Sequence, residues 1–165
     1  MLSEILHRSV SPTNGPANWF LNSLNVVLAT SESTGGAFSL VHHIAPPDHA
    51  IPYHLHHDED EAFFVLDGEF TFIRERKKTV LGPGEYIFLP RNSPHGIRCT
   101  DTAPSTMLIL AMPGTGFVGM FIQTRELLKR RQSLAQVRRV VARTRCLRER
   151  SLFETRGQNA PGTIR

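Results

Sequence analysis

Cysteine is scarce in this chain, and no apolar run is long. The 165 residues include only Cys99 and Cys146, which are far apart and fit neither a thiolate metal motif nor a redox pair. No apolar stretch approaches the roughly 20 residues that cross a bilayer. The N-terminal residues mix acidic and basic side chains without the apolar segment of a signal peptide. We therefore expect a protein of the reducing cytoplasm with no membrane partner.

Basic charge is also scarce over most of the chain, although the net charge is +4. Residues 1–124 carry 7 Lys and Arg against 12 Asp and Glu, a net charge of −5. Residues 125–165 carry 12 against 3, a net charge of +9. The basic character of the chain thus belongs to its C-terminal part, where neither aromatic residues interleaved with the arginines nor a nucleic-acid motif is found. We favour packing of this part on the acidic domain or on a partner subunit over contact with nucleic acid.

Helical periodicity is missing before about residue 124. Short β-forming runs alternate there with Gly, Pro, Asn and Asp, and Asp67-Gly68 is the strongest hairpin signal. Many short strands at regular spacing predict an all-β fold, an antiparallel sandwich or barrel. The predicted strands are residues 25–31, 37–44, 61–66, 69–74, 79–81, 86–89, 95–99, 106–112 and 117–122.

The pattern divides the chain into four segments. Residues 1–20 are rich in turn formers and form an irregular N-terminal segment, and residues 21–122 hold the β-barrel. Residues 123–150 repeat apolar side chains at helical spacing opposite an arginine-rich face, which predicts a C-terminal amphipathic helix. We expect residues 151–165 to be disordered.

Four side chains have the types and spacing of a metal site. His54 and His56 are two residues apart, so in a strand both imidazoles point to the same face. Glu61 begins the next predicted strand, and His95 begins a later one that could lie across the barrel. Three imidazoles and a carboxylate suit one divalent transition metal ion (Fe, Ni, Mn, Cu or Zn) and leave coordination positions open. The alternative, histidines that only satisfy backbone groups, fits a lone residue better than four.

The spacing of the first three ligands resembles the first motif of the cupins. That motif has His-x-His, three or four residues, Glu, six residues and Gly. Here His54 and His56 are followed after four residues by Glu61, and after six more by Gly68. Asp48 stands where the motif usually opens with Gly. None of the ligand positions is lost.

The fourth ligand lies in a stretch that resembles the second cupin motif. Gly84, five residues, Pro90, one residue, Asn92 and then His95 follow that pattern, with Asn92 in the place of a Gly. Asn tolerates the left-handed backbone that such a turn requires. Cys99 stands where the motif often ends in Asn.

Further phrases resemble small single-domain cupins related to quercetin 2,3-dioxygenases. The resemblance implies a jelly-roll barrel, a bound divalent metal and, often, a homodimer. It also implies a metal-dependent dioxygenase that acts on a small aromatic, enolic or phenolic substrate, with Glu61 as general base. A non-catalytic metal or small-molecule binder, and a metal-dependent isomerase or decarboxylase, remain as alternatives. The phrases are Trp19-Phe20-Leu21, Thr34-Gly35-Gly36 and Gly116-Phe117.

Apolar residues of the predicted barrel provide candidate substrate contacts. Phe63 is the best of them, because it shares the face of Glu61 in a strand. Phe38, Phe72 and Met107 are weaker candidates, since a packed β-core would use the same residues. The other titratable residues are placed outside the ligand set. His57 faces away from His56 and is expected to be exposed or to support a ligand from behind. The turn at residues 58–60 is expected to be solvated, with a hydrogen bond from one of its acids to a ligand as the lesser alternative. Surface or interface positions are expected for His42, His43 and His49.

Overall fold

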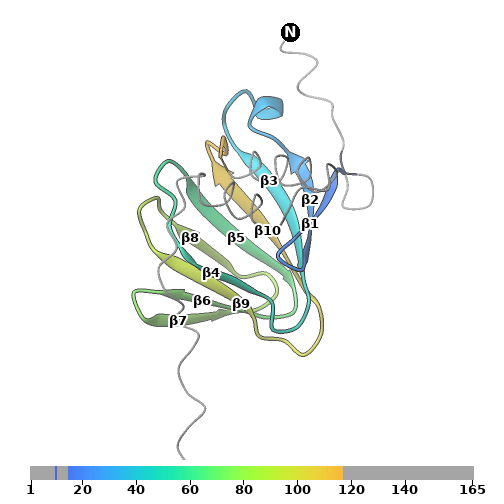
Figure 1. The fold of residues 1–165 in the computed structure, drawn as a ribbon, viewed down its shortest axis with the longest axis vertical. Helices are drawn as coiled ribbons and strands as arrows, with labels where there is room; N and C mark the ends of the chain where they lie inside the picture. The colour runs from blue at the N-terminus through green and yellow to red at the C-terminus, as the bar shows by residue number, and fades with distance from the viewer. Residues whose placement is uncertain (1–9, 11–14, 117–165) are drawn as a thin grey trace, which may run out of the picture.

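The computed structural model of the chain describes residues 10 and 15–116, which form ten strands and one short 3-10 turn, η1 (Glu32–Thr34) (Figure 1). The predicted helix over 123–150 and the tail over 151–165 lie outside the described residues. No helix within the described part is long and apolar enough to cross a membrane. The strands are β1 (Ala17–Phe20), β2 (Ser23–Ala29), β3 (Ser39–Ala45), β4 (Ala50–His54), β5 (Asp60–Asp67), β6 (Phe70–Arg74), β7 (Lys77–Leu81), β8 (Tyr86–Leu89), β9 (His95–Cys99) and β10 (Ser105–Met112).

Two antiparallel sheets make up the barrel, which confirms the all-β jelly-roll prediction. One sheet has six strands in the order β1-β2-β3-β10-β5-β8, and the other has four in the order β4-β9-β6-β7 (Figure 1). The last strand, β10, lies between β3 and β5, so strands far apart in the sequence become neighbours. The sheets therefore bring residues of the two histidine motifs to one end of the barrel.

Alternation along the strands builds the core between the sheets. In β10 the odd-numbered residues from Ser105 to Ala111 are buried, and the even-numbered ones are only partly covered. Period-two alternation is what a sheet with one face on the core requires. The core contains mainly branched and aromatic side chains, among them Val41, Val65, Phe63, Phe70, Phe72, Leu89, Ile97, Met107 and Ile109.

Both residues that replace a motif glycine adopt the left-handed backbone of a glycine. Asp48 has φ 61° in the turn between β3 and β4, and Asn92 has φ 61° in the turn between β8 and β9. Asn and Asp reach this region at lower cost than other residues with a side chain. The two departures from the cupin pattern therefore preserve its backbone geometry.

Gly68 is required by its surroundings as well as by its backbone. It turns the chain between β5 and β6 with φ 74°, and a Cβ at this position would overlap the side chain of Ser105. Gly84 has φ 82°, but a Cβ there would meet nothing within 4 Å. Comparing a substitution at Gly68 with one at Gly84 therefore distinguishes the energetic cost of a left-handed backbone from that of a steric overlap.

We expect Gly68→Ala to destabilise the protein more than Gly84→Ala. Gly84→Ala costs about 1–2 kcal/mol, because alanine must adopt a left-handed backbone. Gly68→Ala carries the same cost and adds an overpacking cost of about 1–3 kcal/mol. Chemical denaturation of the two variants measures the difference in the free energy of unfolding. Equal losses would show that Ser105 yields without cost, and the double variant Gly68→Ala with Ser105→Gly should recover part of the stability.

Three histidines that were assigned to the surface are buried, so that prediction was wrong. His43 is 2% exposed, His49 8% and His42 9%. His43 points into the barrel, where its Nδ1 atom lies 2.7 Å from the amide oxygen of Asn25 on β2. Burial, followed by the charges of His49 and His42, lowers the pKa of His43 from 6.5 to about 3.

This burial makes the metal-free protein sensitive to acid. Below pH 6.5, His43 stays neutral in the folded state but takes up a proton on unfolding. Its contribution to the free energy of unfolding is therefore complete above pH 6.5 and is lost as the pH falls toward about 3. We expect the free energy of unfolding to fall by up to about 1.4 kcal/mol per pH unit from this one group. Urea denaturation of wild type and His43→Gln between these limits measures it. Parallel pH profiles would contradict the assignment.

Candidate metal centre

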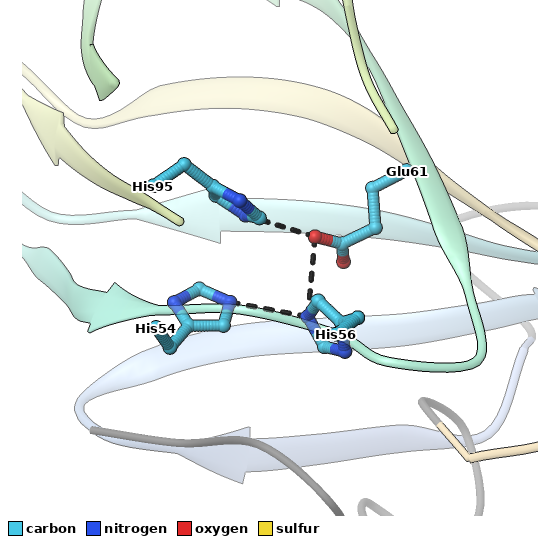
Figure 2. A group of neighbouring side chains, drawn as sticks. All are labelled: His54, His56, Glu61 and His95. Atoms are coloured by element: carbon cyan, nitrogen blue, oxygen red, sulfur yellow. Dashed lines mark hydrogen bonds and ion pairs between the residues drawn. The ribbon is translucent and has the colours of Figure 1, made fainter. Parts of the chain in front are cut away.

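The four predicted metal ligands meet at one end of the barrel (Figure 2). His54 is the last residue of β4, Glu61 the second residue of β5, and His95 the first residue of β9. One nitrogen or oxygen atom from each of the four side chains lies within 4.8 Å of the others. One local detail differs from the prediction: β4 ends at His54, so His56 follows the strand and does not share it.

The ligand atoms face one another at short range. The Nε2 atoms of His54 and His56 are 3.1 Å apart. One carboxylate oxygen of Glu61, Oε2, is 3.2 Å from Nε2 of His56 and 3.0 Å from Nε2 of His95 (Figure 2). Glu61 and His95 are 3% and 2% exposed, so these contacts are shielded from bulk water. The geometry is that of donors gathered around one point.

Backbone carbonyls fix the tautomers of two ligands. His54 donates from Nδ1 to the carbonyl of Pro52 at 2.6 Å, and His95 donates from Nδ1 to the carbonyl of Ser93 at 2.9 Å. A carbonyl only accepts, so the Nδ1 atom carries the proton and Nε2 keeps its lone pair. The free Nε2 of His95 therefore lies 3.0 Å from Oε2 of Glu61, and the free Nε2 of His54 lies 3.1 Å from Nε2 of His56. Lone pairs gathered in this way can bind a cation.

Electrostatics keep the Glu61 carboxylate ionised. Burial alone would raise the pKa of Glu61, but the nearby imidazoles of His56 and His95 hold it well below its usual value. Burial, together with the charge of His95, lowers the pKa of His54 to about 4. For His56, burial is outweighed by Glu61, and the pKa is raised. The site thus presents an ionised carboxylate beside a neutral imidazole at neutral pH.

These residues fit the divalent metal that the donor set implies. Oε2 of Glu61 and Nε2 of His95 are buried and make no hydrogen bond of acceptable geometry, although they lie close together. Buried polar atoms in proteins are normally hydrogen-bonded, and a coordinated ion explains the exception. Neutral imidazoles with one carboxylate suit Fe, Ni, Mn, Cu or Zn. The cluster could hold one such ion, with His54, His56, Glu61 and His95 as ligands.

A clamp between two loops holds the motifs together. The backbone N–H of Asn92, in the β8–β9 turn, donates to the carbonyl of His56 at 2.7 Å. The neighbouring Arg91 donates from its backbone and its guanidinium to the carboxylate of Asp60. His57, which is exposed as predicted, adds a bond from its ring to the side chain of Asn92 at 2.8 Å. The loop before His95 is thereby tied to the loop that carries His56.

Glu59 lies beside His56 at the metal centre. The sequence favours a solvated turn for residues 58–60, with support of a ligand by one of them as the lesser alternative, yet Glu59 is only 4% exposed. Its Oε1 accepts the backbone N–H of Gly116 at 2.7 Å, and its Oε2 lies 4.0 Å from Nδ1 of His56. It therefore stands behind His56, in the place that a carbonyl occupies behind His54 and His95. The sequence feature that could have indicated this contact is the position of Glu59, three residues after the ligand His56.

The four candidate substrate residues lie at different depths. The Phe63 ring makes an edge contact with His95, at 6.2 Å between ring centroids, and packs on Phe72 at 5.1 Å. Met107 pairs with Val65, further along β5, and Phe38 is half-buried just before β3. Phe63, Phe72 and Met107 all belong to the core, as a packed interior requires. Contact with a substrate stays a prediction, and Phe63 is the one placed beside the metal ligands.

Comparison with known families agrees with this fold and site. Residues 40–111 match the family model of the cupin domain. The matched region contains all four clustered ligands and runs from β3 to β10. Residues 40–111 thus carry a cupin domain, which confirms the resemblance drawn from the two motifs.

Individual relatives differ in activity. Over 93 residues, 56% of this chain, the sequence is 28% identical to quercetin 2,3-dioxygenase of Bacillus subtilis. Over 60 residues, 36% of this chain, it is 40% identical to dimethylsulfoniopropionate lyase DddQ of Ruegeria pomeroyi. The matches span 27% and 29% of those proteins, so the chain covers less than a third of each.

A solved structure shows the same fold at lower sequence similarity. The crystal structure of a predicted oxalate decarboxylase from Thermotoga maritima matches with a TM-score of 0.60 and 18% identity. The match covers 64% of this chain and 98% of that one. At this level of identity the likeness concerns the fold alone.

The position of Glu59 predicts a role in metal affinity. Removing its charge by Glu59→Gln should weaken binding of a divalent ion about 10–100-fold, since the carboxylate behind His56 orients the ring and raises its basicity. Competition with a chromogenic chelator measures the change. Asp58→Asn, the same charge change at the exposed neighbouring residue, serves as control. Equal affinities in Glu59→Gln and wild type would show that Glu59 only supports the Gly116 turn.

Proposed function

We propose that this cupin is a metal-dependent dioxygenase of the quercetinase type, acting on a small aromatic, enolic or phenolic substrate. The observation that carries the proposal is the buried Glu61 carboxylate, held between His56 and His95 at 3.2 and 3.0 Å. The partial match to quercetin 2,3-dioxygenase supports the same reaction class. The cupin fold and the possible metal site alone do not specify a substrate or a reaction, so both are part of the proposal.

Each residue of the site has a part in this reaction. His54, His56, His95 and Glu61 would hold the metal, which when bound supplies a Lewis acid and a place for dioxygen chemistry. Glu61, ionised at neutral pH, would accept the hydroxyl proton of the substrate as general base. Phe63, at the edge of His95, offers an apolar contact for an aromatic ring.

Two alternatives use the same residues. A lyase or decarboxylase would also need a metal beside a buried base, and the match to dimethylsulfoniopropionate lyase DddQ is the observation that favours elimination chemistry. A non-catalytic binder would keep the metal and lack turnover. The expected homodimer remains a prediction, as does the cytoplasmic location.

Oxygen uptake by the reconstituted protein tests the proposal. Protein loaded separately with Fe, Ni, Mn or Cu should consume oxygen in the presence of a flavonol. Glu61→Gln should lower the rate by about 10²–10⁴-fold, the usual contribution of a general base, while elemental analysis still finds the metal bound. Asp67→Asn, the same change at an exposed position of β5, should keep the wild-type rate.

The outcome separates the alternatives. No oxygen uptake with any of the four metals would reject the flavonol dioxygenase. Release of an alkene from dimethylsulfoniopropionate under the same conditions would favour the lyase. Metal retention without turnover of either substrate would favour the binder.

A further inference from the structure

A second cluster of imidazoles lies inside the barrel, away from the metal centre. His43 on β3 and His49 in the β3–β4 turn have ring centroids 5.4 Å apart and planes tilted by 45°. His43 is level with Val65, because both residues pair with Met107 across the sheet. Val65 is four residues beyond Glu61 on β5, so the two sites are separated by about 13 Å along the strand.

The hydrogen bonds of Asn25 fix the tautomer of His43. The amide nitrogen of Asn25 donates to the carbonyl and to the hydroxyl of Ser23, at 3.4 and 3.1 Å. Its amide oxygen therefore faces His43, whose Nδ1 must be the donor across the 2.7 Å contact. The lone pair of His43 is thus on Nε2.

His49 is held in the same state. Its ring bonds to the backbone of Leu21, which raises its pKa, although burial is the larger effect and lowers it. The Nε2 atoms of His43 and His49 are both buried and have no partner among the described residues. A buried acceptor without a partner costs about 1–3 kcal/mol. Two such acceptors in neighbouring rings indicate that a group able to bind both nitrogen lone pairs lies between them.

A proton does not fill this role, because burial holds the pKa of His43 at about 3. A cation can. The three histidines of the metal centre have ring centroids 4.5, 5.0 and 6.0 Å apart, and the 5.4 Å of His43 and His49 falls within that range. Two imidazoles at this distance can share one ion.

The surroundings select the kind of cation. Met107 lies directly opposite His43 on β10, so its thioether is on the same inner face. The thiol of Cys99 is engaged with the Ser105 hydroxyl at 3.3 Å. Neither the imidazoles nor the thioether brings negative charge, and burying a divalent ion with neutral donors alone is costly. Nitrogen and thioether donors suit a soft ion such as Cu(I).

We propose that His43, His49 and Met107 form a second cation site, specific for a soft monovalent ion of the Cu(I) class. The site is separate from the centre of His54, His56, Glu61 and His95, and it does not depend on the reaction proposed above. It occupies the opposite end of the barrel core, where Phe70 packs beside His43 at 6.4 Å.

Copper stoichiometry tests this site. Metal-free protein is titrated anaerobically with Cu(I) against a chromogenic Cu(I) chelator, in a Cys146→Ser background that removes the thiol outside the described residues. His49→Gln and Met107→Leu should each bind one equivalent of Cu(I) fewer than the background protein. His42→Gln is the matched control, because His42 is the buried neighbour on the same strand but points to the other face of the sheet.

The outcomes decide the proposal. Background stoichiometry in His49→Gln would overturn the site and leave a buried water between the two rings. If Met107→Leu alone bound as much Cu(I) as the Cys146→Ser background protein, Met107 would not be a ligand, and the proposed three-residue site would be wrong. Loss of one equivalent in His42→Gln would also overturn it, since the loss would then reflect general damage to the sheet. Thermal unfolding of each variant shows that it is folded, and having two test positions keeps the proposal open to refutation if one variant does not fold.

Discussion

The buried carboxylate of Glu61 is the constraint around which this structure is arranged. An ionised group in a protein interior costs several kcal/mol unless charges or hydrogen bonds compensate it. Here His56 and His95 provide that compensation from two loops that are distant in the sequence. The barrel must therefore hold the start of β5 beside the start of β9. The Asn92 backbone bond to His56 and the Arg91–Asp60 ion pair do this on the solvent side of the site.

The barrel core is apolar in its middle and polar toward both ends. Phe63 and Phe72 pack between the metal centre and the row that contains Met107 and Val65. This middle layer separates the two imidazole clusters by about 13 Å along the strand. Each cluster has its own means of fixing tautomers: backbone carbonyls for His54 and His95 near the metal centre, and Asn25 for His43.

The sequence predicts the fold and the four ligands well, and the polar interior poorly. Spacing alone singled out Glu61 from three adjacent acids, because ligand geometry repeats across cupins in a local pattern. The burial of His43 has no such local sign, since it depends on Asn25, 18 residues away on another strand. The burial of Glu59 was missed for a similar reason: its partner Gly116 lies 57 residues further along the chain. Contacts between residues that are distant in the sequence decide which polar side chains are buried in the barrel. The periodicity of residues along one strand does not reveal these contacts.

The bond between the Asn92 N–H and the His56 carbonyl has a consequence for how metal is acquired. Because backbone atoms join the two ligand loops, the loops stay together whether or not an ion is present. Metal uptake then carries little of the entropy cost of ordering loops, in contrast to small zinc domains, whose folding free energy is the binding free energy. We expect ions to exchange without unfolding. The ion that the site could hold would then be set by the affinity order of its donors and by supply.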